Sequence, residues 1–111
     1  MKVVFVIDSP LIRMRVKTDW GFPHLPRAGE MISPRIIMLQ IDFSYRKFSQ
    51  YMTDEAREDF KKYSNSESDI EACFREWLYD VISGVNVVES ILYCPDPDND
   101  ENIIPEIRLS D

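Results

Sequence analysis

The sequence contains few of the residues on which small enzymes and metalloproteins rely. Its 111 residues include one histidine, two cysteines and three glycines. His24, Cys73 and Cys94 together are one ligand short of a tetrahedral zinc site. Their spacing does not bring either thiol to the imidazole as a nucleophile with its base, and the glycines form no cofactor loop. We therefore expect a protein without catalysis, cofactor or bound metal.

Two cysteines are also too few for a disulfide framework, and we expect free thiols, as in a reducing compartment. No apolar run approaches the length needed to span a membrane, and the apolar run after Met1 is too short for a signal-peptide core. These absences predict a cytoplasmic protein with no membrane segment. The chain length predicts a single domain over residues 1–111.

The clearest pattern that is present lies between Ser68 and Gly84. Seven apolar residues recur at i, i+3, i+4, i+7, i+8, i+11 and i+12, namely Ile70, Cys73, Phe74, Trp77, Leu78, Val81 and Ile82. Ser68 and Glu71 have the spacing of a capping box, and Gly84 is a suitable stop. The pattern predicts a helix over 68–83. Because an isolated helix of this length is marginal in water, its apolar face and Trp77 are expected to pack on a sheet.

The remaining elements are predicted from shorter patterns. Alternating or β-branched apolar residues predict strands at about 3–18, 31–41, 85–94 and 103–109. Asp8-Ser9-Pro10 interrupts the first of these, which is either a hairpin or one strand with a bend, and the bend is favoured. Pro105 predicts that the last strand lies at an edge.

Two further helices are predicted at about 43–52 and 54–63, the second capped by Thr53. The order of strands, helices and strands indicates an α+β domain. Its antiparallel sheet has four to five strands, and the helices inserted between them cover one face.

Charge is distributed unequally along the chain, whose net charge is −7. Residues 1–52 carry eight basic and four acidic side chains, whereas residues 53–111 carry five basic and sixteen acidic ones. Arg13, Arg15 and Lys17 share one strand face, but the overall acidity argues against a nucleic-acid partner. We expect these basic residues to pair with Glu89 or Glu106. An acidic face that meets a basic partner remains the alternative.

An acidic tip, residues 95–102, separates the last two predicted strands. Asp96, Asp98 and Asp100 alternate as in a calcium loop, but Glu101 and Ile107 stand where such a loop needs glycine and glutamate. A looser divalent-cation site at the three aspartates remains an alternative. The tip is expected to be mobile, and replacing its aspartates with asparagine is expected to raise stability slightly by relieving like-charge repulsion.

The loop at residues 19–28 carries the candidate binding residues Trp20, Phe22, His24 and Arg27. Loops on a rigid scaffold commonly carry recognition, and Trp and Arg are frequent at interface hot spots. The alternative is that Trp20 and Phe22 fold back and plug the open end of the sheet. Residues 25–32, LPRAGEMI, resemble a turn device at strand starts in small bacterial β-rich domains, and this resemblance implies no activity.

The sequence thus predicts a small cytosolic protein-binding or self-associating module without catalysis. Its partner would be another protein or a second copy of the chain. The alternative is a small enzyme or divalent-cation-binding domain that uses surface carboxylates.

Overall fold

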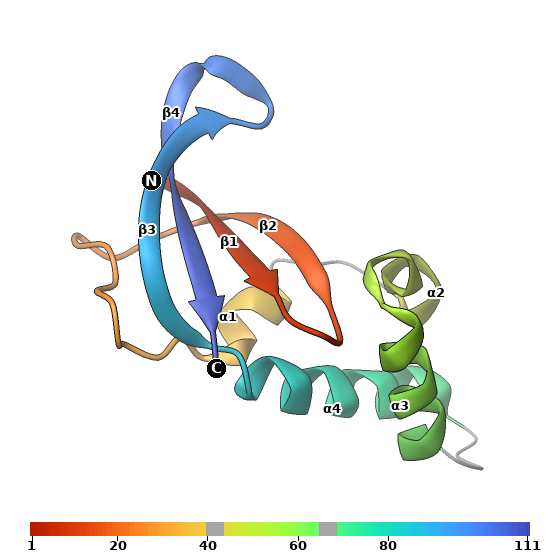
Figure 1. Ribbon diagram of the computed structural model, residues 1–111. Coiled ribbons are helices and arrows are strands. Elements are labelled where there is room, and N and C mark those ends of the chain that lie inside the picture. The colour runs from red at the N-terminus through yellow and green to blue at the C-terminus, as the bar shows by residue number, and fades with distance from the viewer. Residues whose placement is uncertain (40–43, 65–68) are drawn as a thin grey trace.

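The computed structural model describes residues 1–39, 44–64 and 69–111. Its strands are β1 (Lys2–Asp8), β2 (Arg13–Asp19), β3 (Val87–Asp96) and β4 (Asn99–Ser110). Between β2 and β3 lie α1 (Pro34–Leu39), α2 (Tyr45–Phe48), the 3-10 helix η1 (Ser49–Tyr51), α3 (Asp54–Ser64) and α4 (Ile70–Ser83). The fold is α+β, as predicted (Figure 1).

The four strands form one mixed sheet in the order β2-β1-β4-β3. β1 pairs with β2 and β3 pairs with β4 in antiparallel fashion, while β1 and β4 are parallel. The prediction that Pro105 places the last strand at an edge is wrong, because β4 lies between β1 and β3. Proline is tolerated there since pairing with β1 begins only at Glu106, one residue later.

The first predicted strand is a hairpin rather than a bent strand, and buried Ser9 explains the reversal. Its hydroxyl donates to the carbonyl of Ile12 (3.2 Å) and accepts from the amides of Leu11 (3.3 Å) and Ile12 (3.1 Å). Its own amide also donates to the Ile12 carbonyl at 2.9 Å. One short side chain thus satisfies most of the turn's backbone groups.

The predicted strand at 31–41 is largely wrong, because residues 34–39 form α1. Only a single bridge from Met31 to Val87 retains strand pairing, and residues 40 and 41 lie outside the described part of the chain. Pro34 occupies the first helical position, where its fixed φ favours a helix and its missing amide breaks no helical bond. A short apolar run does not by itself distinguish a helix from a buried strand.

The other helices agree better with the sequence. α3 and α4 are found where they were predicted, and the Thr53 hydroxyl accepts the Ala56 amide at 3.1 Å as the predicted cap of α3. The predicted segment 43–52 is divided into α2 and η1, with residue 43 undescribed. α4 is capped by Asp69, which accepts the Ala72 amide at 3.1 Å.

The predicted capping box pairs Glu71 with Ser68, and Ser68 lies outside the described residues. The Glu71 carboxylate accepts the amide of Tyr45 at 3.0 Å and so fixes the start of α2 against α4.

One hydrophobic core joins the helices to the sheet. α4 contributes Phe74, Trp77, Leu78 and Ile82 to the same buried cluster that contains Phe5 and other strand residues. The Trp77 ring is 1% exposed and contacts Phe60 of α3 (5.4 Å) and Phe74 (6.0 Å). Figure 1 shows α4 packed across one end of the sheet, while the β3–β4 hairpin extends well beyond the helices.

Replacing Trp77 with alanine should lower the free energy of unfolding by about 3–5 kcal/mol, because it removes a buried aromatic ring and leaves a cavity. Urea denaturation measures this loss. Tyr79→Ala, on the exposed side of the same helix, should change stability by about 0.5 kcal/mol or less. Equal midpoints for the two variants would show that α4 does not organise the core.

Candidate functional site

Trp20, in the loop that follows β2, is buried against the sheet. Its ring is 7% exposed and packs edge-on against Phe5 of β1, with ring centres 6.0 Å apart. Its Nε1–H donates to the carbonyl of His24 at 2.9 Å, which folds the loop back over the ring. Phe22 lies on the outer side of Trp20 at 5.1 Å and is 60% exposed. Of the two predicted roles, burial of Trp20 matches the plug.

The predicted binding residues are therefore not one exposed cluster. Phe22, His24 and Arg27 are exposed, but Trp20 is not. Arg27 begins a tight turn in which its amide donates to the Glu30 carboxylate and its carbonyl accepts the Glu30 amide at 3.0 Å. Gly29 has φ +92°, a conformation that side chains other than glycine's rarely permit.

This turn fastens the loop to the beginning of β3. The Gly29 amide donates to the Val88 carbonyl, and the Val88 amide donates to the Glu30 carbonyl, both at 2.8 Å. The Ile32 amide and the Asn86 carbonyl add a third bond at 2.9 Å. The segment resembling a strand start thus covers the edge of β3, but only as far as Val88.

Beyond Val88 the outer edge of β3 is free of backbone partners among the residues the structure describes. β3 pairs there only with β4, on its other side. Leu92 and Tyr93 on this stretch are 48% and 66% exposed, and Ile103, which is paired with Pro95, is 61% exposed. An exposed apolar edge strand is a ready template for pairing with another chain.

The opposite edge of the sheet is protected differently. β2 alternates buried residues with Arg13, Arg15 and Lys17, and charged side chains on an edge discourage pairing with another strand. The sequence identified this basic face, but it did not identify the contrasting apolar edge of β3.

Buried carboxylates lie on the sheet's outer face. This face carries the side chains of Arg15, Lys17, Glu106 and Arg108. Glu106 is 3% exposed, and its two oxygens lie 3.0 Å from an Arg15 nitrogen and 3.2 Å from an Arg108 nitrogen. The predicted pairing of the basic strand with Glu106 is confirmed for Arg15. Two guanidinium groups offset the cost of burying this carboxylate.

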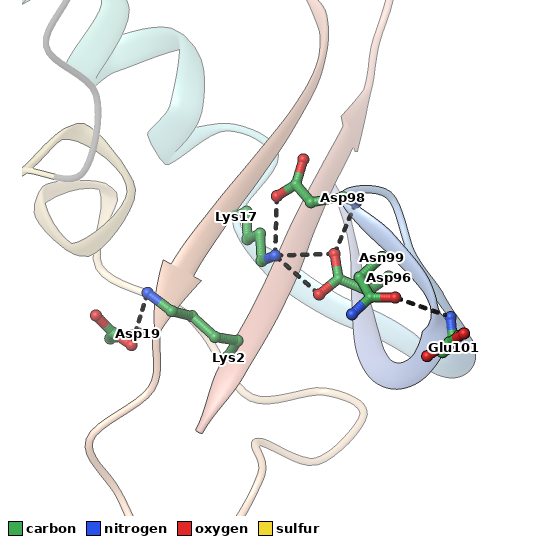
Figure 2. A network of polar contacts seen from close by, with 7 residues as sticks. All are labelled: Lys2, Lys17, Asp19, Asp96, Asp98, Asn99 and Glu101. Carbon is green, nitrogen blue, oxygen red and sulfur yellow. Dashed lines mark hydrogen bonds and ion pairs between the residues drawn. The ribbon is translucent and has the colours of Figure 1, made fainter.

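The acidic tip is anchored by its first aspartate. Both oxygens of Asp96 lie 2.8 Å from the Lys17 ammonium, and Asp98 lies 2.9 Å from it (Figure 2). Asp96 is only 6% exposed. Lys17 and Asp96 belong to strands at opposite edges of the sheet, so their contact requires the β3–β4 hairpin to curl over the outer face. The expected like-charge repulsion within the tip is therefore offset by Lys17, which contacts both Asp96 and Asp98. The mobility of the tip stays a prediction.

The same contacts involve two of the three aspartates of the alternative cation site, Asp96, Asp98 and Asp100. The first two carboxylates already bind an ammonium group, and the Asp98 amide donates to Asp96 at 2.9 Å. Within residues 1–39, 44–64 and 69–111, no group of three or more His, Cys, Asp or Glu residues is arranged to hold a metal ion.

A hollow of about 750 Å³ lies beside Val6 on the outer face. Its lining includes Arg13, Arg15 and Arg108, and neither histidine nor cysteine is among its lining residues. Burial and the Glu106 carboxylate raise the pKa of the Cys94 thiol. Arg13, Arg15 and Arg108 at this hollow are each engaged in an ion pair.

Comparison with protein-family models, curated proteins and solved structures finds no match to this chain. None of the described helices has the length and apolar character needed to cross a membrane.

Trp20→Ala should destabilise the fold by about 3–5 kcal/mol because the plug is lost, whereas Phe22→Ala should cost less than about 1 kcal/mol. Urea denaturation compares the two. In a Trp77→Phe variant, where Trp20 is the remaining tryptophan, emission should be blue-shifted and protected from acrylamide. Red, freely quenched emission would mean that the plug does not form.

Asp96→Asn should lower the melting temperature at pH 7 more than Asp98→Asn does, because Asp96 holds Lys17 through both oxygens. Lys17 lowers the pKa of Asp96 below its ordinary value of 3.8. The pair therefore stabilises the fold above that value, and this contribution is lost as the pH falls through the lower folded-state pKa. Thermal melts from pH 7 to pH 2 should show a shallower acid decline in Asp96→Asn. A rise in melting temperature at pH 7 would instead restore the like-charge account.

Proposed function

We propose that this chain is a small cytosolic protein-binding module, without catalysis, whose binding surface is the free edge of β3. The single observation that carries the proposal is the stretch beyond Val88, where an edge strand lacks a described backbone partner and exposes Leu92 and Tyr93. An added strand obtains affinity from backbone hydrogen bonds and specificity from alternate side chains. The two free cysteines support a reducing compartment.

The loop at residues 19–28 contributes to this function by limiting where a partner can bind. Its Gly29 and Glu30 occupy the edge at Val88, so a partner strand must end there. Phe22, His24 and Arg27 stay exposed on the same loop and are candidates for side-chain contacts at that end. Trp20 contributes indirectly, because its burial holds the loop in place.

Two charges placed on the edge should abolish binding without unfolding the chain. The variant Leu92→Lys with Tyr93→Lys changes two exposed residues, and lysine on an edge strand opposes pairing. Immobilised parent and variant chains are compared by quantitative mass spectrometry of proteins retained from source-cell lysate. The amount of each protein that the parent retains should be about tenfold or more lower on the variant.

Leu39→Lys is the control, because it also replaces an exposed apolar residue with lysine, at an 82% exposed position on α1. It should retain the same proteins as the parent. Circular dichroism checks that each variant is folded. If the edge variant retained the same proteins as the parent, and Phe22→Ala or Arg27→Ala lost them, the binding surface would be the loop at residues 19–28 rather than β3.

A further inference from the structure

We infer that the strand received by β3 is β3 of a second copy of this chain, paired antiparallel about Leu92. The inference rests on the proposed function and names its partner. Its basis is the length and placement of the free edge. At one end, the amide and carbonyl of Val88 are both engaged by residues 29 and 30. At the other end, Pro95 lacks an amide donor, and β3 ends at Asp96.

The free interval, residues 89–95, has its midpoint at Leu92. An antiparallel pair of identical strands is related by a two-fold axis, and an axis at the midpoint lets each copy fill the whole interval of the other. Leu92 then lies opposite Leu92 of the second copy, and Ile91 lies opposite Tyr93 of the second copy. Each β3 ends where the other is already covered by its own Gly29 and Glu30.

The side chains agree with this register. Ser90 lies opposite Cys94 of the second copy, and no acid faces an acid in the regular part of β3. Glu89 lies at the register irregularity between Val88 and Ser90. The exposed apolar area of Leu92 and Tyr93 is placed at the centre of the interface, where water is best excluded.

The other edge does not permit the same arrangement. Antiparallel pairing of β2 with itself about Val16 would place Arg15 opposite Lys17 of the second copy, and like charges directly opposite each other are destabilising. Pairing β2 of one copy with β3 of the next would leave free edges at both ends and form an open chain of molecules. Pairing of β3 with β3 closes as a dimer without placing these like charges opposite each other, and it gives a continuous eight-stranded sheet.

Disulfide trapping tests the register directly. In a Cys94→Ser background, Leu92→Cys places two thiols across the axis and should give a disulfide-linked dimer under mild oxidation. Ser90→Cys in the same background is the matched control. Its two thiols would be offset by four residues, about 13 Å along the strands, and should not join. Equal cross-linking of the two variants, or preferential cross-linking of Ser90→Cys, would overturn the register.

Sedimentation equilibrium separates this inference from the proposed function. The parent and Leu39→Lys should form dimers, and Leu92→Lys should raise the dimer dissociation constant by about tenfold or more. A parent that stays monomeric at all concentrations would overturn self-pairing. If Leu92→Lys with Tyr93→Lys still abolished capture of a different protein, β3 would remain a binding edge with another partner. If Leu92→Lys with Tyr93→Lys still formed dimers and still captured the same proteins as the parent, both proposals would be contradicted.

Discussion

The parallel pairing of β1 with β4 determines most of the remaining architecture. These strands come from opposite ends of the described chain and lie side by side at the centre of the sheet. Parallel strands cannot be joined by a tight turn, so the intervening chain must cross over, and the helices lie within that crossover. Each central strand then has one antiparallel neighbour, β2 or β3. The two strands left at the edges differ in chemistry, and this difference is the basis of the proposed function.

The outer face shows how the sheet is stabilised where helices do not cover it. Glu106 forms ion pairs with Arg15 and Arg108, and Asp96 of the curled hairpin forms an ion pair with Lys17. The contacts of Arg15 with Glu106 and of Lys17 with Asp96 bridge strands that are not neighbours in the sheet. They hold the long β3–β4 hairpin over the sheet and, with it, the geometry of the β3 edge.

Sequence periodicity is sufficient to predict an element that is long and half buried. The stripe centred on Trp77 predicted α4, and Thr53 located the start of α3. Periodicity is insufficient where a single residue determines the local structure. The hydrogen bonds of Ser9 produce a hairpin where a bend is predicted, and Pro34 begins a helix in an apolar run that also fits a strand.

The candidate site was harder to predict for the same reason. Trp20 was identified as important, with both of its possible roles, because an aromatic residue in a proline-rich loop must be either covered or used. The β3 edge was not identified, because edge position depends on strand order. That order is set by contacts such as Phe5 with Ile107, between residues about a hundred positions apart in the sequence, and local patterns carry no signal for it.

Amide hydrogen exchange, followed residue by residue by NMR at several protein concentrations, tests the central claim most directly. At low concentration some amides within residues 89–94 should exchange rapidly, because one side of β3 is open, whereas the central amides of β1 should be protected throughout. Raising the concentration should slow exchange in residues 89–94 and leave β1 unchanged. Amides in β3 that are all as protected as those of β1 at the lowest concentration would contradict the account, since the edge would then already be covered.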